Sequence, residues 1–206
     1  MTLPRILLAS ALWLIGGLAH GADWSAQPGS TLGFSTSFQG ETFEGRFQKF
    51  APTIRFDPTR LADSRFDVRI TLASADTRNE ERDDTLRGSD FFNSGKLPEA
   101  RYVASRFRAL GGNRYVADGV LSLRGVSKPV PLAFTWSGGG KPVLVGEATL
   151  RRLDFGVGGG EWSDTEVLPN EVKVTTRLVL APAAAKTKQP APTTTKPAPK
   201  PAAKPQ

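Results

Sequence analysis

Few residues in this chain are of types that could do chemistry. Its 206 residues contain no Cys, a single His at position 20 and a single Met at position 1. We expect His20 to lie in a segment that is removed from the mature protein. A Ser-His-Asp or Cys-His nucleophile, a CxxC redox pair, a disulfide cage and an ordinary zinc or haem site are therefore excluded. Carboxylate chemistry, Lys and Arg electrostatics, and binding remain.

Two acidic doublets, Glu80–Glu81 and Asp83–Asp84, are the candidates for acid/base catalysis. Adjacent residues on a helix point about 100° apart, so neither doublet forms the facing carboxylate pair that glycoside hydrolysis requires. Asp83, Asp84 and Asp90 could in principle bind calcium, but the chain has no Asp-x-Asp-x-Asp-Gly loop. We therefore predict no catalytic residue, no metal site and no cofactor.

Three side chains in the same segment could instead contact the polar head of a ligand. They are Asn79, Arg82 and Arg87, and a guanidinium offers a planar, bidentate donor to phosphate oxygens. The alternative is that the arginines form ion pairs and hold the segment in place, with Glu80, Asp83, Asp84 or Asp154 as partners. The excess of carboxylates beside the arginines argues against a strongly anionic ligand.

The segment 77–88 is the one place where the sequence predicts a helix. Thr77 and Glu80 match a capping box, with Thr at the N-cap and Glu at N3, and Gly88 stands where a helix C′ residue belongs. A helix this short is marginal in water by itself. It must dock on the rest of the domain, and Leu86 with Phe91–Phe92 is the expected contact.

The remainder of the middle region reads as β-strands. Eight stretches alternate apolar and polar residues, as half-buried strands do, and turn signals separate them. We predict an all-β fold, a lipocalin-like antiparallel up-and-down barrel of about eight strands; a two-sheet sandwich is the alternative. Small inward residues such as Gly45, Gly119 and Ala148 favour a cavity. The stretches are 32–38, 43–47, 66–72, 100–104, 119–123, 130–136, 146–150 and 172–180.

The formal net charge of +7 is unevenly distributed. Of 27 basic residues, five are lysines after position 182 and one is Arg5, which leaves 21 in residues 22–182 against all 20 acidic ones. The central domain is therefore nearly neutral, and no nucleic-acid partner is predicted.

The two ends of the chain differ from the middle. Arg5, the 13 apolar residues 6–18 and the small residues Ala19 and Gly21 predict a cleaved signal peptide over 1–21. The protein is then periplasmic, or alternatively secreted. Residues 183–206 are almost entirely Ala, Pro, Thr and Lys, which predicts a disordered tail. Its lysines could contact an anionic membrane or cell-wall surface, or it could be a solubilising linker.

Several motifs resemble the YceI family of exported lipid-binding, polyisoprenoid-binding proteins with a lipocalin-like barrel. The longest is DTRNEERDDTLRGSDFFN at 76–93, and the resemblance covers residues 23–182. One departure is Thr85, where many members carry His; a head-group contact from that His would be absent here. The other motifs are STLGF at 30–34, FEGRF at 43–47, KLP at 96–98, GVLSLRGVSKPVP at 119–131 and RLDFG at 152–156.

The resemblance implies a barrel over 22–182 that encloses the apolar chain of an isoprenoid or similar lipid, without catalysis. The alternative is an interaction or stress-related module whose barrel is filled by its own side chains and which acts through its surface and basic tail. The sequence leaves the oligomeric state open, a dimer included. The ligand-lining residues expected from the inward alternation are Phe34, Phe43, Phe66, Val68, Ile70, Tyr102, Leu121, Leu123, Phe134 and Trp136.

Overall fold

The computed structural model describes residues 23–183. The predicted signal peptide, 1–21, and all but the first residue of the predicted tail, 183–206, lie outside the described part of the chain. The division of the chain at these two boundaries therefore stays a prediction.

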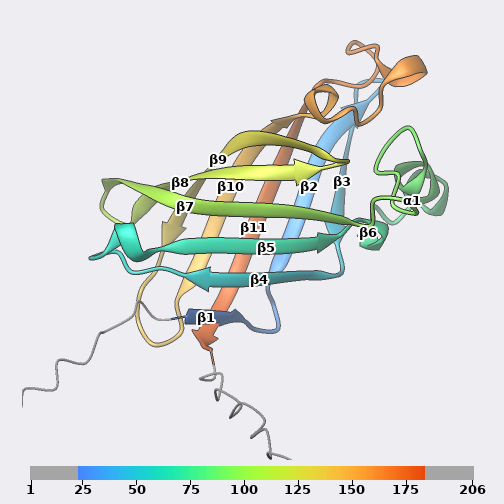
Figure 1. Cartoon of the computed structure of the whole chain (residues 1–206). Helices are drawn as coiled ribbons and strands as arrows, with labels where there is room; N and C mark the ends of the chain where they lie inside the picture. The colour runs from blue at the N-terminus through green and yellow to red at the C-terminus, as the bar shows by residue number, and fades with distance from the viewer. Residues whose placement is uncertain (1–22, 184–206) are drawn as a thin grey trace, which may run out of the picture.

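The described chain forms a closed antiparallel barrel (Figure 1). Eight strands follow one another around the ring in the order β1-β4-β5-β7-β8-β9-β10-β11, and β11 pairs with β1 to close it. Strands β2, β3 and β6 extend the wall from β11. This arrangement confirms the predicted up-and-down barrel. The bounds are β1 Asp23–Ala26, β2 Thr31–Phe38, β3 Glu41–Phe47, β4 Phe50–Arg55, β5 Arg65–Thr71, β6 Ala75–Asp76, β7 Glu99–Gly111, β8 Arg114–Leu123, β9 Val126–Trp136, β10 Val143–Arg151 and β11 Glu171–Pro182.

Helical structure is confined to short pieces. The α-helix α1 spans Glu80–Arg87, and four 3₁₀ turns span Leu61–Asp63 (η1), Leu72–Ser74 (η2), Arg152–Phe155 (η3) and Gly160–Trp162 (η4). Both α1 and the loop 152–170 lie at the same end of the barrel (Figure 1). No helix in residues 23–183 has the length and apolar character needed to cross a membrane.

Strand β11 is shared between two partners. Near its end it pairs with β1, with Pro182 opposite Trp24, and earlier it pairs with β2, with Arg177 opposite Thr31. The backbone N–H of Ala183 donates to the Asp23 carbonyl at 2.8 Å. The first and last described residues therefore lie side by side, at the end of the barrel away from α1 (Figure 1).

The alternating sequence pattern corresponds to the two faces of the barrel wall. In β8 every second residue from Tyr115 to Leu123 is buried, whereas Asp118 and Ser122 between them are only partly buried; Val116, on the outer face, is also buried. This is the two-residue period of a strand with one face toward a core. The buried, inward-facing residues of β8 are Tyr115, Ala117, Gly119, Leu121 and Leu123.

The helix α1 begins later than the sequence predicts. Its N-cap is Asn79, whose side-chain oxygen accepts the backbone N–H of Arg82 at 2.9 Å. Thr77 is not the cap, because its hydroxyl donates to the Asp83 carboxylate at 2.7 Å. At the other end Gly88 has an ordinary φ of −64°. The predicted docking is present, since Leu86 and the following Phe91 and Phe92 are buried in one cluster.

Candidate ligand-binding cavity

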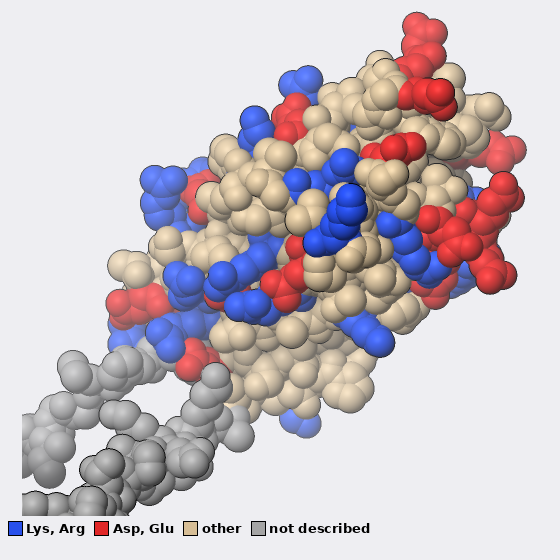
Figure 2. Space-filling view, turned by 45° about the vertical axis from the view of Figure 1, so that its right-hand side comes forward, with Lys and Arg blue, Asp and Glu red and all other residues tan. Residues whose placement is uncertain are grey.

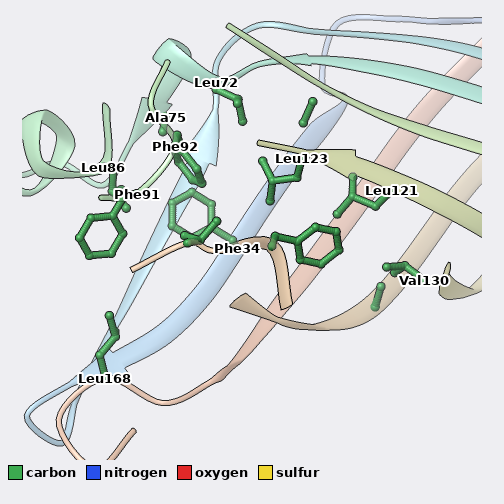
Figure 3. Packing of buried hydrophobic residues seen from close by; sticks show 14 residues of the cluster. Phe34, Leu72, Ala75, Leu86, Phe91, Phe92, Leu121, Leu123, Val130 and Leu168 are labelled. Atoms are coloured by element: carbon green, nitrogen blue, oxygen red, sulfur yellow. The ribbon is translucent and has the colours of Figure 1, made fainter. Parts of the chain in front are cut away.

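A cavity occupies the barrel at the end that carries α1, which we call the α1 end. Its volume is about 190 Å³, and its wall is almost entirely carbon. Figure 3 shows Phe34, Leu121, Leu123 and Val130 from the barrel wall, facing Leu86, Phe91 and Phe92 from the segment around α1. The wall therefore consists of strand residues together with the residues that cover the barrel at this end.

The opposite end of the barrel, which we call the closed end, is filled with aromatic rings. The ring of Phe56 lies 5.0 Å from that of Tyr115, 5.1 Å from that of Phe134 and 4.9 Å from that of Trp136. These side chains belong to a second hydrophobic cluster, and other members of that cluster, such as Ile54 and Phe66, form the inner part of the cavity wall. Because this end is packed, it offers no route into the cavity.

Eight of the ten side chains predicted to contact a ligand line the cavity. Two do not, because Phe134 and Trp136 lie in the aromatic cluster of the closed end. Whether any of them binds a ligand stays a prediction. The eight lining residues are Phe34, Phe43, Phe66, Val68, Ile70, Tyr102, Leu121 and Leu123.

Other residues that line the cavity were not among the ten predicted ligand contacts. Leu32, Val172 and Val174 belong to strand stretches that were predicted, so their inward position follows from the alternation. Leu72 ends the predicted stretch 66–72, whereas Phe91, Phe92, Val157 and Leu168 come from loops. No periodic pattern marks residues of that kind, and only their apolar character signals burial.

Two inward glycines accommodate aromatic rings. A Cβ on Gly45 would stand 2.3 Å from a ring carbon of Phe34, and a Cβ on Gly119 would stand 2.3 Å from Cζ of Tyr102. The rings of Phe34 and Tyr102 therefore lie directly against the backbone of the neighbouring strand. The prediction that these glycines leave empty space is wrong at this point, because a neighbour's ring fills the space and the cavity lies beyond the rings.

Tyr102 spans the boundary between the two clusters. Its ring packs against both, and its hydroxyl lies 3.0 Å from the carbonyl oxygen of Ala117 and 3.1 Å from that of Val130. Burial raises the pKa of the Tyr102 hydroxyl well above its ordinary value. The hydroxyl is therefore neutral, and it is already hydrogen-bonded to the barrel wall.

Arg152, also on the cavity wall, is the one strongly buried guanidinium, with 4% of its surface exposed among the described residues. It donates to five backbone carbonyls of the loop around it, so all of its N–H groups are used. Desolvation by burial lowers the pKa of the Arg152 guanidinium. The five acceptors are the carbonyls of Pro169, Val157, Gly158, Trp162 and Leu168.

The three predicted head-group residues have structural partners of their own. Asn79 caps α1. Arg87 pairs with Asp84 at 2.7 Å and donates to the Ala73 carbonyl, as the helix-holding alternative predicts. The guanidinium carbon of Arg82 lies 4.4 Å from the ring centre of Phe43, a cavity-lining residue. Of the three, Arg82 is thus the one in contact with the cavity wall.

Neither a metal site nor an orphaned polar group is present in the described part of the chain. No cluster of three or more His, Cys, Asp or Glu side chains that could hold a metal ion occurs there. Every fully buried side-chain nitrogen or oxygen in residues 23–183 has a hydrogen-bond partner. The cavity therefore offers apolar contact and few unused polar groups.

A closed antiparallel barrel with an apolar cavity at one end and a packed opposite end is a lipocalin-like barrel. Comparisons with known proteins agree with this class. Residues 24–180 match the model of the YceI-like domain. The UPF0312 protein of Photorhabdus laumondii is 37% identical over 66% of this chain and 72% of its own length. The UPF0312 protein of Pseudomonas syringae pv. syringae is 31% identical over 77% and 88%. The chain belongs to the YceI family.

Solved structures are similar over most of the domain. BcnA of Burkholderia cenocepacia superposes with a TM-score of 0.71 at 30% identity, covering 73% of this chain and 96% of BcnA. A polyisoprenoid-binding domain from Saccharophagus degradans superposes with a TM-score of 0.62 at 17% identity, covering 80% of this chain and all of that domain. At that identity the second likeness shows the fold alone.

Proposed function

We propose that this protein is an exported, non-catalytic binding protein that encloses a polyisoprenoid or another long-chain amphiphilic lipid for carriage or storage. The observation that carries the proposal is the apolar cavity inside the barrel. The structural neighbour from Saccharophagus degradans is described as a polyisoprenoid-binding domain, and the YceI-like match covers residues 24–180. An isoprenoid chain is therefore the first ligand to test.

The physical basis of such binding is the removal of hydrocarbon from water. Each CH₂ group buried in an apolar site contributes about 0.8 kcal/mol, from which the cost of association is subtracted. The cavity wall is nearly all carbon, and the four polar residues on it, Thr36, Tyr102, Arg152 and Thr176, already have hydrogen-bond partners. The apolar chain then lies inside, and a polar head stays near the α1 end.

For location we propose the periplasm, with secretion as the alternative. The basis is the sequence at 1–21, where Arg5 precedes 13 apolar residues and a small-residue cleavage site. Sequencing the N-terminus of protein from a periplasmic extract tests this proposal. Ala22 as the first residue is the expected result, and an intact residue 1 would contradict it.

The ligand proposal is tested by extraction. Protein purified without detergent is expected to release a long-chain lipid into organic solvent, and its native mass spectrum is expected to show the matching mass increment. Protein that carries no lipid and takes up no added prenol would contradict the proposal. It would favour the rival function, an interaction module with a filled barrel that acts through its surface.

A pair of matched variants locates the binding site. Ala148 lines the cavity, whereas Ala133, opposite Glu147 on the neighbouring strand, is exposed outside the barrel. Ala148→Trp is expected to reduce uptake of a fluorescent prenol at least about tenfold, since an indole occupies space that the ligand needs. Ala133→Trp adds the same ring outside and is expected to leave uptake unchanged. Circular dichroism confirms that both fold, and equal uptake by the two would place the ligand elsewhere.

A further inference from the structure

The α1 end carries an exposed apolar patch beside the cavity. We call residues 38–45 and 153–168 the rim. Phe38 and Val167 are each 36% exposed, and the backbone N–H of Gln39 donates to the Val167 carbonyl at 2.9 Å. The two segments are thus joined. The ring of Trp162 lies 6.1 Å from that of Phe38 and 5.3 Å from that of Phe91, a cavity-lining residue.

The rim is also strongly acidic. Its two segments contain six carboxylates and no Lys or Arg. Figure 2 shows acidic side chains gathered at the end that carries α1 and the loop 152–170, while basic side chains lie mainly over the barrel wall. Of the rim carboxylates, Asp154 pairs with Arg151 at 4.0 Å. An aromatic patch among carboxylates fits a ligand that is basic and rich in proline, because Pro-rich segments dock on aromatic side chains. The six carboxylates are Glu41, Glu44, Asp154, Glu161, Asp164 and Glu166.

The chain itself contains a segment with these properties. Residues 196–205 read KPAPKPAAKP, with three lysines, four prolines and no acidic residue. Such a sequence favours the extended polyproline II conformation, and so loses little conformational entropy when it docks. Charge and composition therefore both match the rim.

The length of the intervening chain is also sufficient. Strand β11, 12 residues long, spans about 40 Å between the closed end and the α1 end. The 14 residues from Pro182 to Lys196 extend about 43 Å as polyproline II. Lys196, Lys200 and Lys204 can therefore reach the rim, whereas Lys186 and Lys188, within six residues of Pro182, cannot.

We propose that residues 196–205 dock on the rim of their own barrel. The docking does not depend on the proposed lipid-binding function.

Docking is measured with a nitroxide on the tail. Because the chain has no Cys, Ala202→Cys gives one labelling site in the full ¹⁵N-labelled protein. We expect the amide signals of residues 38–45 and 161–167 to lose intensity at low salt. Those of 111–113, in the β7–β8 hairpin away from α1, are expected to be unaffected. The loss should disappear in about 0.5 M NaCl, where the screening length is about 4 Å.

Two charge reversals of equal size provide the control. The double variant Lys196→Glu, Lys200→Glu is expected to abolish the rim effect, and Lys186→Glu, Lys188→Glu to retain it. Equal loss in both would mean that only overall charge matters, which contradicts docking by the distal segment. Contact between molecules is tested by mixing full chains that carry the nitroxide but no ¹⁵N with ¹⁵N-labelled chains that end at Pro182. Signal loss of equal size in this mixture would show contact between molecules and overturn the proposal. The proposal would also be overturned if tail contacts were seen only after anionic phosphatidylglycerol vesicles are added.

Discussion

At the scale of single residues, two glycines determine the shape of the cavity wall. Gly45 and Gly119 let the rings of Phe34 and Tyr102 lie on the backbone of the next strand. Any side chain at either glycine would push the ring inward. The cavity therefore depends on residues that contribute no surface of their own to a ligand.

Gly119→Ala tests this dependence. The new methyl group would stand 2.3 Å from Tyr102 Cζ, and overpacking of this kind costs about 1–3 kcal/mol. In a double-mutant cycle by urea unfolding, we expect the cost to fall by more than half when Tyr102 is also changed to Leu. A cost that is the same in both backgrounds would mean that the methyl group is accommodated by another route.

Arg152 is expected to be essential for the loop that surrounds it. Arg152→Met removes the donor for five backbone carbonyls, and each buried acceptor left without a partner costs about 1–3 kcal/mol. Water will reach some of these carbonyls, so we expect the free energy of unfolding, measured with urea, to fall by at least about 3 kcal/mol. The matched control is Arg151→Met on the exposed neighbour, for which we expect little change.

The sequence could not predict these two roles. Alternation predicts that Gly119 faces inward, but not which ring covers it, because the ring belongs to another strand. The same limit explains Phe134 and Trp136, which face inward as predicted but lie at the closed end. Alternation with a period of two residues shows on which face of a strand a residue lies, but not how far along the barrel axis it lies.

At the scale of elements, α1 depends on a side-chain cap. Asn79→Ala removes the acceptor for the Arg82 N–H and is expected to cost about 1 kcal/mol. Asn79→Asp keeps an acceptor at the helix N-terminus and should retain stability. Thermal unfolding measures both. If prenol uptake, but not stability, falls in Asn79→Ala, the residue acts on the ligand head group and its capping role is secondary.

The strands were predictable where they are long and alternate, and were missed where they are short or interrupted. All eight predicted stretches lie in strands or continue them. Strand β1 has only four residues, and β4 contains Pro52, a residue that argues against a strand interior. Strand β4 forms nonetheless, because it pairs with β5 on one side and β1 on the other. Local signals cannot supply that tertiary support.

At the scale of the whole molecule, surface ion pairs determine how stability depends on pH. Hydrogen bonds from Arg101 lower the pKa of the Asp67 carboxyl, and those from Arg108 lower the pKa of Asp118. A carboxyl whose folded pKa lies below its unfolded value stabilises the fold above the unfolded pKa, and that contribution is lost as the pH falls through the folded pKa. Stability should therefore decline below about pH 4.

Urea unfolding of Asp67→Asn against the unsubstituted protein checks this expectation. The variant should be less stable at pH 6, and the difference should shrink toward pH 3, because below the unfolded pKa the carboxyl binds a proton more readily in the unfolded protein than in the folded one. Residues 23–183 contain no His, so the stability of the domain should hardly change between pH 6 and pH 8. A difference that is constant from pH 6 to pH 3 would contradict the role of the Asp67–Arg101 pair.

The closure of the barrel between β1 and β11 has a consequence for the order of folding. Thr31 pairs with Arg177 and Trp24 with Pro182, so the ring cannot close before the last strand has been synthesised. Pairings between residues so distant in sequence form slowly. A chain that folds late is still unfolded while it is being synthesised. This delay suits a protein that, as we propose, must cross a membrane before it folds.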